Sequence, residues 1–535
     1  MYGFGMDYGL IKTDMPIADT VYGKVCGENR KGIAVFRGIP YGGGSGGQKR
    51  FLAPEAAKAW EGIRDCRKNG FYAPQLGTSI SGDIILGAYF SGGYPEKFGC
   101  GEEKQGEDCL VLNVLTPGCD NRKRPVVVYI HGGGFATGSG TLVLGADEWV
   151  REEDIVVVGV NHRLNIFGYL YLGEIDDRYR DSGVAGLLDL VLALEWVQDN
   201  IRNFGGDPGN VTIMGESGGG AKVSMLLAMK EAQGLFHKAI VESGSVPIGK
   251  KNRKEAVEQT RRLLKQLKVP EDHLELLWEK SIGELLEAME EAGDTKAMDF
   301  IPVADETHLL PHRGYVAPEG SEKIPLLTGT SEDELAVFLD IRLLDEITWE
   351  NMAEYLQKTA EAWMPLYCLD KDNIPVVIER FRGLDKKEEN PGHLFAKIVS
   401  QISALGSGSY YQAMTKAGQE APVYHYVVSY DVPHPAVADG ENIGNNYGKH
   451  SYAWHTADLP LQMRIVLHPE CEEISRYMAH AWAAFIRSGN PSTEDIIWEP
   501  FTREGKKTMV ISEKCYMQYD PLGKMRCILE EYGKE

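Results

Sequence analysis

The stretch 211–220, VTIMGESGGG, most constrains what this chain can fold into. A short apolar run leads into a serine between glycines, and a helix-forming stretch, 222–230, follows it. The Gly-x-Ser-x-Gly pattern is typical of a nucleophile elbow, a tight strand-to-helix turn with no room for flanking side chains. Such a turn exposes the hydroxyl of Ser217 and directs the amide dipoles of the helix toward it. Because the pattern also occurs by chance, its meaning depends on the other parts of a catalytic site.

Apolar and β-branched runs alternate with helical patterns around this elbow. The spacing of apolar residues predicts a helix over 184–203. Strands that alternate with helices indicate a mostly parallel sheet with helices on both faces. The predicted strands of this sheet cover residues 109–115, 125–130, 155–160, 211–214, 324–328, 423–428 and 508–512.

Two charge-rich helical regions interrupt the alternation. We expect them to be insertions, at about 249–320 and 341–420, that cap the carboxyl edge of the sheet. The whole chain, 1–535, is then one domain of the α/β class. A glycine- and asparagine-rich stretch, 437–450, reads as a long loop near the entrance to the site.

Charge and composition exclude several functions. The net charge of −22, from 56 Lys and Arg against 78 Asp and Glu, argues against nucleic acid or an anionic membrane as a partner. No apolar run approaches the ~20 residues of a membrane helix, and residues 1–20 lack the pattern of a secretory signal. The nine cysteines contain no Cys-x-x-Cys pair, so zinc-ribbon and thioredoxin sites are unsupported. We expect a cytoplasmic protein with reduced thiols.

A serine nucleophile needs donors for the oxyanion that it creates. The motif 131–135, HGGGF, directly follows a predicted buried strand, which is the context of a glycine-rich oxyanion loop. Consecutive glycines let the backbone turn its amides inward. The predicted donors are the amides of Gly133, Gly134 and Gly218, and His131 is interpreted as a structural residue of the loop.

The acid that orients the base is expected between the serine and the histidine in the chain. Glu332, Asp333 and Glu334 all follow the carboxyl end of the predicted strand 324–328, where a carboxylate can reach the catalytic face. Spacing alone does not choose among the three.

The base must be a histidine later in the chain. His425 falls in a predicted strand and His480 in a predicted helix, so both are interpreted as structural. His450 and His455 both follow strand 423–428 in a loop-like stretch, and spacing favours His455 over His450.

Ordered motifs extend nearly end to end along the chain. They include FRGIPY (36–41), EDCLVLNV (107–114), HGGGF (131–135), FGGDPGN (204–210), GESGG (215–219) and GNP (489–491). With these motifs the chain resembles the type-B carboxylesterases, which include para-nitrobenzyl esterases, liver carboxylesterases and cholinesterases. The resemblance implies the α/β-hydrolase fold and hydrolysis of carboxylic esters through a serine acyl-enzyme. It implies no metal and no organic cofactor.

The resemblance also assigns roles that spacing left open. The Gly-Thr-x-x-Asp-Glu pattern of the family implies that Glu334 is the acid, and its His-x-x-x-Leu-Pro pattern implies that His455 is the base. Together with Ser217 they would form a Ser-His-Glu triad. Glu216 resembles a buried acid that helps to shape the site, and Ser243 matches a serine behind the catalytic residues.

The chain departs from the family pattern at two places that bear on the site and on the thiols. Gly218 replaces the usual alanine after the nucleophile, which we expect to loosen the backbone of the elbow. Cys109 lacks the usual disulfide partner, because Ala73 stands at that place, although Cys100 offers an alternative.

The expected partner is a small-molecule ester, for an enzyme that is a monomer or a homodimer. Two alternative functions are considered beside a general carboxylesterase. One is an esterase specialised for plant hydroxycinnamoyl esters, such as feruloyl esters. The other is a non-catalytic adhesion protein on the same fold, which the complete triad disfavours.

Overall fold

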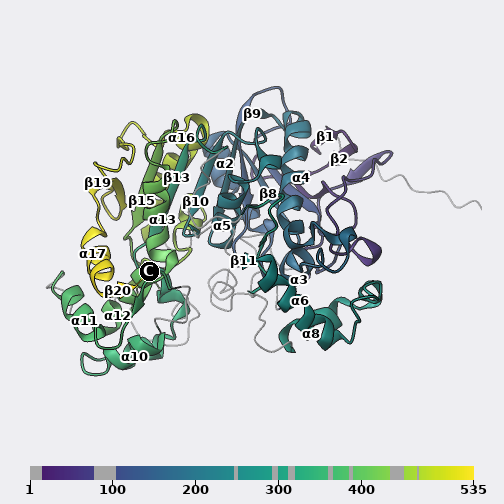
Figure 1. Ribbon diagram of the computed structural model, residues 1–535. Helices are drawn as coiled ribbons and strands as arrows, with labels where there is room; N and C mark the ends of the chain where they lie inside the picture. The colour runs from purple at the N-terminus through teal and green to yellow at the C-terminus, as the bar shows by residue number, and fades with distance from the viewer. Residues whose placement is uncertain are drawn as a thin grey trace, which may run out of the picture.

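In the part of the chain that the structure describes, eleven strands build the central sheet (Figure 1), in the order β19-β18-β15-β13-β10-β9-β7-β8-β6-β4-β3. The computed structural model describes residues 15–76, 104–245, 251–291, 299–310, 320–359, 365–384, 390–433, 451–466 and 469–534. The strands of the sheet are β3 (Glu28–Arg30), β4 (Ile33–Pro40), β6 (Val111–Thr116), β7 (Arg124–Ile130), β8 (Val156–Val160), β9 (Gly206–Glu216), β10 (Lys238–Glu242), β13 (Leu326–Ser331), β15 (Val423–Val428), β18 (Lys507–Ile511) and β19 (Tyr516–Tyr519).

The centre of the sheet is parallel and its edges are antiparallel. Strands β8, β7, β9, β10, β13, β15 and β18 pair in parallel, whereas β3, β4, β6 and β19 run antiparallel to their neighbours. This confirms the predicted mostly parallel sheet. The predicted strands coincide with observed ones, but β9 starts at Gly206, earlier than expected, because it continues beside β7 as far as Arg124.

Helices cover both faces of the sheet, as predicted. The helix expected over 184–203 is α4, followed by a short 3₁₀ turn, 201–204. The helix expected over 222–230 starts earlier, because the glycines after Ser217 form its first turn. The helices against the sheet include α2 (Asp147–Glu153), α4 (Ala185–Asn200), α5 (Gly218–Leu226), α13 (Ala404–Lys416) and α16 (Glu472–Ser488). Three further helices pack mainly on other helices: α3 (Asn165–Tyr169) on α4, α15 (Asp458–Gln462) on α16, and α17 (Gly523–Tyr532) on α11 (Ile374–Arg382) and α12 (Pro391–Ile402).

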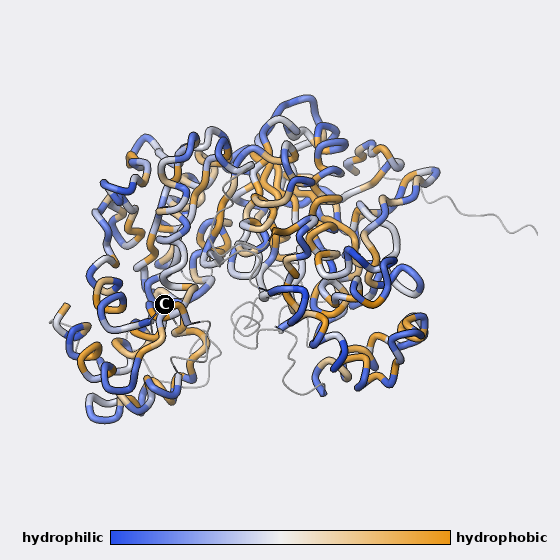
Figure 2. The backbone as a smooth tube through the Cα atoms, viewed as in Figure 1, coloured by the Kyte–Doolittle hydropathy of each residue, from blue (hydrophilic) through white to orange (hydrophobic). Residues whose placement is uncertain are grey.

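Side chains of β7 alternate between two apolar cores, one on each face of the sheet. Val126, Val128 and Ile130 lie in one core with apolar residues of α4 and α5. Val127 and Tyr129 lie in the other, with apolar residues of α2 and α16. Figure 2 shows the apolar segments concentrated in the central strands. A strand buried on both faces explains the continuous apolar run in its sequence.

Further helices occupy the two regions that we interpret as insertions. In Figure 1, α6 and α8 lie at the lower right and α10 and α11 at the lower left. These helices are α6 (Arg253–Leu267), α7 (Leu276–Glu279), α8 (Ile282–Glu291), α9 (Ile341–Glu346), α10 (Met352–Thr359), α11 (Ile374–Arg382) and α12 (Pro391–Ile402). Smaller sheets pair β1 (Ile17–Thr20), β2 (Gly23–Cys26) and β5 (Ile63–Asp65), β11 (Lys251–Asn252) with β12 (Val303–Ala304), β14 (Cys368–Leu369) with β20 (Gly533–Lys534), and β16 (Val432–Pro433) with β17 (Ser451–Tyr452).

Among the described residues, no helix combines the length and the apolar character that a bilayer crossing requires. The eight cysteines in the same part of the chain are free thiols, and Cys109 is fully buried. Cys100 and the predicted loop 437–450, with His450, lie outside the described residues.

Candidate active site

Ser217 occupies the turn between β9 and α5. Its backbone has φ 57° and ψ −124°, a conformation that costs a non-glycine residue strain energy. The turn is held by hydrogen bonds from the Ser217 amide to the Glu242 carbonyl, at 2.8 Å, and from the Ala221 amide to the Ser217 carbonyl, at 3.0 Å. Ser217 is partly exposed, whereas its neighbours on both sides are buried. The elbow therefore presents one hydroxyl to the outside.

The glycines of the elbow are required by close packing. A Cβ at Gly215 would lie 2.4 Å from the carbonyl carbon of Gly219, and a Cβ at Gly219 would lie 2.0 Å from the Ile130 carbonyl oxygen. Real Cβ contacts are not this short, so larger residues would force the turn apart. The turn can therefore close only because Gly215 and Gly219 have no side chain.

Glu334 follows β13 and is completely buried. Its Oε1 accepts hydrogen bonds from the Ser331 amide at 2.7 Å, the Thr330 hydroxyl at 2.6 Å and the Ser243 hydroxyl at 2.6 Å. Its Oε2 contacts Nδ1 of His455, and the His455 amide donates to the Glu334 carbonyl at 3.1 Å. These contacts fix the imidazole with Nδ1 toward the carboxylate, the arrangement of the acid and base in a catalytic triad.

The two competing acids bind other side chains. Asp333 lies 3.1 Å from Nε2 of His393, and Glu332 lies 3.1 Å from the ammonium of Lys397. Burial works to raise the pKa of Asp333, but the hydrogen bond and charge of His393 outweigh it and lower the pKa. Of the three candidate acids, Glu334 is the one in contact with His455.

Glu216 lies on the other side of the imidazole. Its Oε1 is 3.3 Å from Nε2 of His455, and both side chains are buried. Among the described residues, the Ser217 hydroxyl makes no hydrogen bond with His455. In unliganded enzymes the hydrogen bonds of catalytic groups are often long and tighten only with substrate. The imidazole therefore stands between the carboxylates of Glu216 and Glu334.

The loop after β7 supplies the predicted oxyanion donors. Gly133 and Gly134 have φ 79° and 61°, values that favour glycine. The Gly133 carbonyl accepts from the amides of Ala136 and Thr137, at 3.2 and 3.1 Å. In a trans peptide the amide points away from the carbonyl, so the Gly134 amide points away from this turn. None of the described residues accepts a hydrogen bond from the amides of Gly133, Gly134 or Gly218.

Gly218 packs directly against the loop. A Cβ at this position would lie 2.1 Å from the Gly134 carbonyl oxygen and 2.4 Å from the Gly134 Cα. The expectation of a loosened backbone at Gly218 is therefore wrong, because the backbone of Gly134 fills the space that an alanine methyl would need.

His131 stabilises the loop from behind. Its Nδ1 donates to the Gly132 carbonyl at 2.9 Å, and its ring stacks on His162 at 4.6 Å between centroids. Burial, and then the charge of Lys222, lower the pKa of His131 to about 3, so the ring is neutral. This is the structural role that we expected for His131.

Sequence reasoning missed three buried ionisable residues next to the site. Glu242 accepts hydrogen bonds from the Trp482 indole at 2.5 Å and the Gln462 amide at 2.9 Å, and burial raises its pKa well above the usual range. Burial, and then the charge of Glu334, raise the pKa of Asp458 to about 6. The third is Lys222 in α5. The sequence does hint at Lys222, because it is the one charged residue in the otherwise uncharged run GGGAKVSML.

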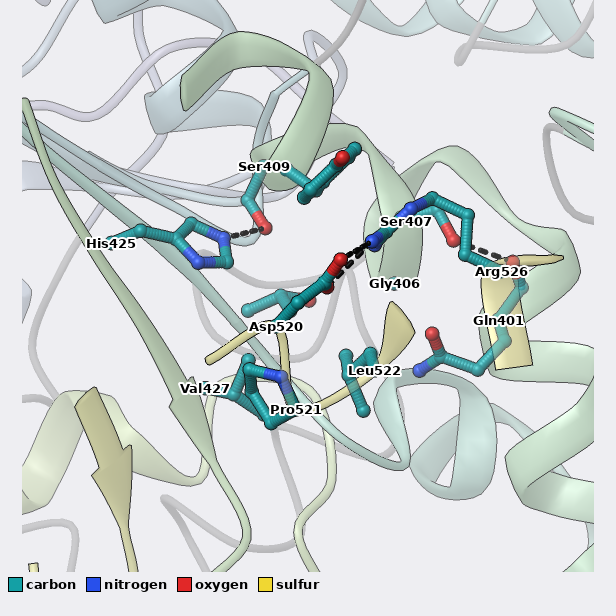
Figure 3. A pocket seen from close by; sticks show the side chains of 12 residues that line it. Gln401, Gly406, Ser407, Ser409, His425, Val427, Asp520, Pro521, Leu522 and Arg526 are labelled. Carbon is teal, nitrogen blue, oxygen red and sulfur yellow. Dashed lines mark hydrogen bonds and ion pairs between the residues drawn. The ribbon is translucent and has the colours of Figure 1, made fainter. Parts of the chain in front are cut away.

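A second serine–histidine pair occurs elsewhere, in a small cavity of about 10 Å³ (Figure 3). Ser409 lies 3.2 Å from Nε2 of His425, but Nδ1 faces the hydroxyl of Thr508 at 3.0 Å and no carboxylate. Figure 3 shows Asp520 directed at Arg526 rather than at the histidine. No described carboxylate orients this histidine, and the cavity has room for about one water, in keeping with a structural His425.

The sequence model of the carboxylesterase family matches residues 14–528. The para-nitrobenzyl esterase of Bacillus subtilis is 31% identical over 531 residues, which cover 95% of this chain and 97% of that protein. Liver carboxylesterase 1 of Oryctolagus cuniculus is 30% identical over 514 residues, covering 90% and 87%. Among solved structures, a carboxylesterase of Geobacillus stearothermophilus superposes with a TM-score of 0.76 at 29% identity, covering 96% of this chain and 99% of that one.

Proposed function

This chain belongs to the carboxylesterase family, and we propose that it hydrolyses carboxylic esters with Ser217 as nucleophile, His455 as base and Glu334 as acid. It is a serine hydrolase of carboxylic esters that forms an acyl-enzyme. The observation that carries the residue assignment is the contact between Nδ1 of His455 and the buried carboxylate of Glu334, beside the elbow.

The reaction follows from this geometry. The Ser217 hydroxyl attacks the ester carbonyl while Nε2 of His455 takes its proton. Glu334 holds the imidazole and stabilises its cation, and Ser243 holds Glu334 in turn. The imidazolium then protonates the leaving alcohol. Water attacks the acyl-enzyme with His455 as base, and the serine is restored.

The oxyanion of each tetrahedral intermediate binds the amides of Gly133, Gly134 and Gly218. Loss of one such donor typically costs about 2.7–4 kcal/mol in the barrier. Glu216, 3.3 Å from Nε2, adds a second negative charge beside the imidazolium. We assign it a supporting electrostatic role.

The proposed function is tested with short para-nitrophenyl esters, a para-nitrobenzyl ester and a feruloyl ester. We include the para-nitrobenzyl ester because a relative with 31% identity bears that name. We expect hydrolysis of the short-chain esters, with a burst of para-nitrophenol equal to the enzyme concentration when deacylation is slower than acylation. Release no faster than in buffer from every ester would contradict the proposal. Turnover confined to the feruloyl ester would favour the hydroxycinnamoyl specialist.

Gly218→Ala would install the residue that is usual in the family, and we expect it to impair this enzyme. The new methyl would meet the Gly134 backbone at 2.1 Å and displace the loop with its donors. A shift of about 1 Å at a catalytic group costs about 10²-fold in rate, so kcat/KM should fall by this order. Gly283→Ala is the matched control, because Gly283 also lies in the first turn of a helix and its added Cβ would lie 4.0 Å from the Ser281 hydroxyl, an ordinary contact. Equal activities of wild type and Gly218→Ala would show that the loop yields to the methyl.

We also propose that the whole chain is one catalytic domain, in which the helices at about 249–320 and 341–420 are insertions. Support comes from the central sheet, whose strands come from residues 28 to 519. Limited proteolysis that released a stably folded fragment with the triad incomplete would contradict a single domain.

For the compartment we propose the reducing cytoplasm. The free thiols of the eight described cysteines support it, since exposed Cys119, Cys368 and Cys527 would be open to oxidation elsewhere. Disulfides found in stoichiometric amount in the native protein would contradict it.

A further inference from the structure

Lys222 is a lysine buried without any exposure in the helix that carries the nucleophile. Its ammonium donates hydrogen bonds to two backbone carbonyls, at 2.7 Å to Gly134 and at 3.2 Å to His131. It also lies 5.1 Å from the centre of the Phe135 ring, within range of a cation–π interaction. All three partners belong to the glycine-rich loop after β7.

None of the described acidic residues forms an ion pair with this ammonium. No charge of an Asp or Glu in the described part of the chain acts appreciably on it, and burial lowers its pKa to about 7. The titratable groups that face it are the imidazoles of His131 and His162, and burial keeps the pKa of both low and the rings neutral. A buried charge is costly unless its hydrogen bonds are satisfied. Here the carbonyl oxygens of His131 and Gly134, the negative ends of two peptide dipoles, accept the hydrogen bonds of the ammonium.

The two carbonyls lie on either side of the proposed oxyanion donors in the loop. His131 and Gly134 stand at the two ends of the turn that contains the donor amides of Gly133 and Gly134. One ammonium bound to both ends restricts how that turn can rotate. The amides of Ala136 and Thr137 donate hydrogen bonds to the Gly133 carbonyl, which keeps this carbonyl inside the turn.

The same side chain ties the loop to the elbow. Ser217, the Gly218 amide and Lys222 belong to one continuous turn and helix, and Gly218 already contacts the Gly134 backbone. The Lys222 side chain adds a hydrogen-bonded link across that contact. It thereby sets the spacing between the nucleophile and the donors of the loop.

We propose that Lys222 is a positioning residue, which fastens the oxyanion loop to the nucleophile helix through the carbonyls of His131 and Gly134. The inference rests on the proposed function, because it gives the loop amides their role as oxyanion donors. Lys222 touches the carbonyl side of the loop, so it acts through the loop and does not contact the substrate.

The test compares Lys222→Met with Lys416→Met. Lys416 is an equally buried lysine, 1% exposed, whose ammonium also donates to two backbone carbonyls, those of Ser321 and Glu322, but it lies in α13 outside the oxyanion loop. The readouts are kcat and KM for a short para-nitrophenyl ester and the inhibition constant of an aliphatic trifluoromethyl ketone. The serine hydroxyl adds to the ketone carbonyl, its proton passes to the base, and the resulting hemiketal oxyanion needs the same donors as the transition state.

We expect Lys222→Met to lower kcat/KM by about 10²-fold, the cost of a shift of about 1 Å at a catalytic group. The loss should appear in kcat, and the ketone should bind more weakly by a similar factor, because both depend on the oxyanion. Lys416→Met should keep the wild-type values. Loss of fold alone would lower the number of active sites and leave the inhibition constant of the remaining sites unchanged.

A second variant, Lys222→Gln, carries a shorter, uncharged amide that reaches at most one of the carbonyls. It should show a loss of kcat and of ketone binding in the same direction.

Wild-type values of kcat and of ketone inhibition in both variants would overturn the proposal. If neither variant folds while Lys416→Met does, Lys222 serves folding and the proposal is likewise overturned. An inactive wild type would instead refute the proposed function, so the two failures are distinguishable.

Discussion

Ser217→Ala should lower kcat for para-nitrophenyl acetate by on the order of 10⁶-fold, the scale of removing a serine nucleophile from a triad. The variant keeps the backbone and loses only the oxygen that forms the acyl-enzyme bond. Because the Ser217 hydroxyl makes no hydrogen bond with the described residues, the fold should not depend on it. The melting temperature should therefore stay that of the wild type, and the initial burst of para-nitrophenol should disappear.

Ser409→Ala is the matched control for this variant. Ser409 is also a serine beside a histidine, 3.2 Å from Nε2 of His425, but that histidine meets no carboxylate among the residues that the structure describes. We expect the control to hydrolyse esters at the wild-type rate. A Ser217→Ala enzyme that retains more than a small fraction of the rate would reject Ser217 as the nucleophile.

His455→Ala should cause a loss of similar size, since removing the base of a triad costs about as much as removing its serine, on the order of 10⁶-fold in kcat. Without the imidazole the serine proton has no acceptor, and the Glu334 carboxylate is left without its partner. The double variant Ser217→Ala/His455→Ala should be no slower than either single variant, because the two groups act as one unit. Steady-state kinetics of the three variants check this.

His450→Ala is the comparison that the sequence itself suggests, because spacing left both histidines open. We expect this variant to keep wild-type activity. Full activity of His455→Ala together with an inactive His450→Ala would transfer the role of base to His450.

Local patterns were sufficient to predict the scaffold of the site. Strands buried on both faces are continuous apolar runs, so the parallel strands β7, β8 and β9 were visible in the sequence. The elbow was visible because its glycines are a steric necessity of a turn only a few residues long. The starts of α5 and β9 were misjudged, because glycines at a helix start and a long pairing with β7 run against local propensity.

The three candidate acids could not be told apart from local pattern, because they differ in their contacts across the fold. Glu332, Asp333 and Glu334 are adjacent in the chain, yet they meet Lys397, His393 and His455, respectively. Only the resemblance to the family had assigned Glu334. The close approach of Gly218 to Gly134 also joins segments that are far apart in sequence, so the glycine suggested looseness where the structure has tight packing.

Buried charges were the other feature that the sequence concealed. A lysine in an apolar helix is usually a snorkelling surface residue, whereas Lys222 points at the carbonyls of a loop 88 residues earlier. Glu242 and Asp458 are buried acids whose partners come from other elements of the fold. Such groups are recognised only when their neighbours are known.

The central claim is that Ser217 is the residue acylated during ester hydrolysis. Its most direct test is mass spectrometric mapping of the covalent adduct after inactivation with a para-nitrophenyl phosphonate, which transfers its phosphonyl group to an activated serine and releases para-nitrophenol. We predict one phosphonyl group per chain, on the peptide that contains Ser217, in proportion to the activity lost. Stoichiometric inactivation with the group on any other residue would contradict the account.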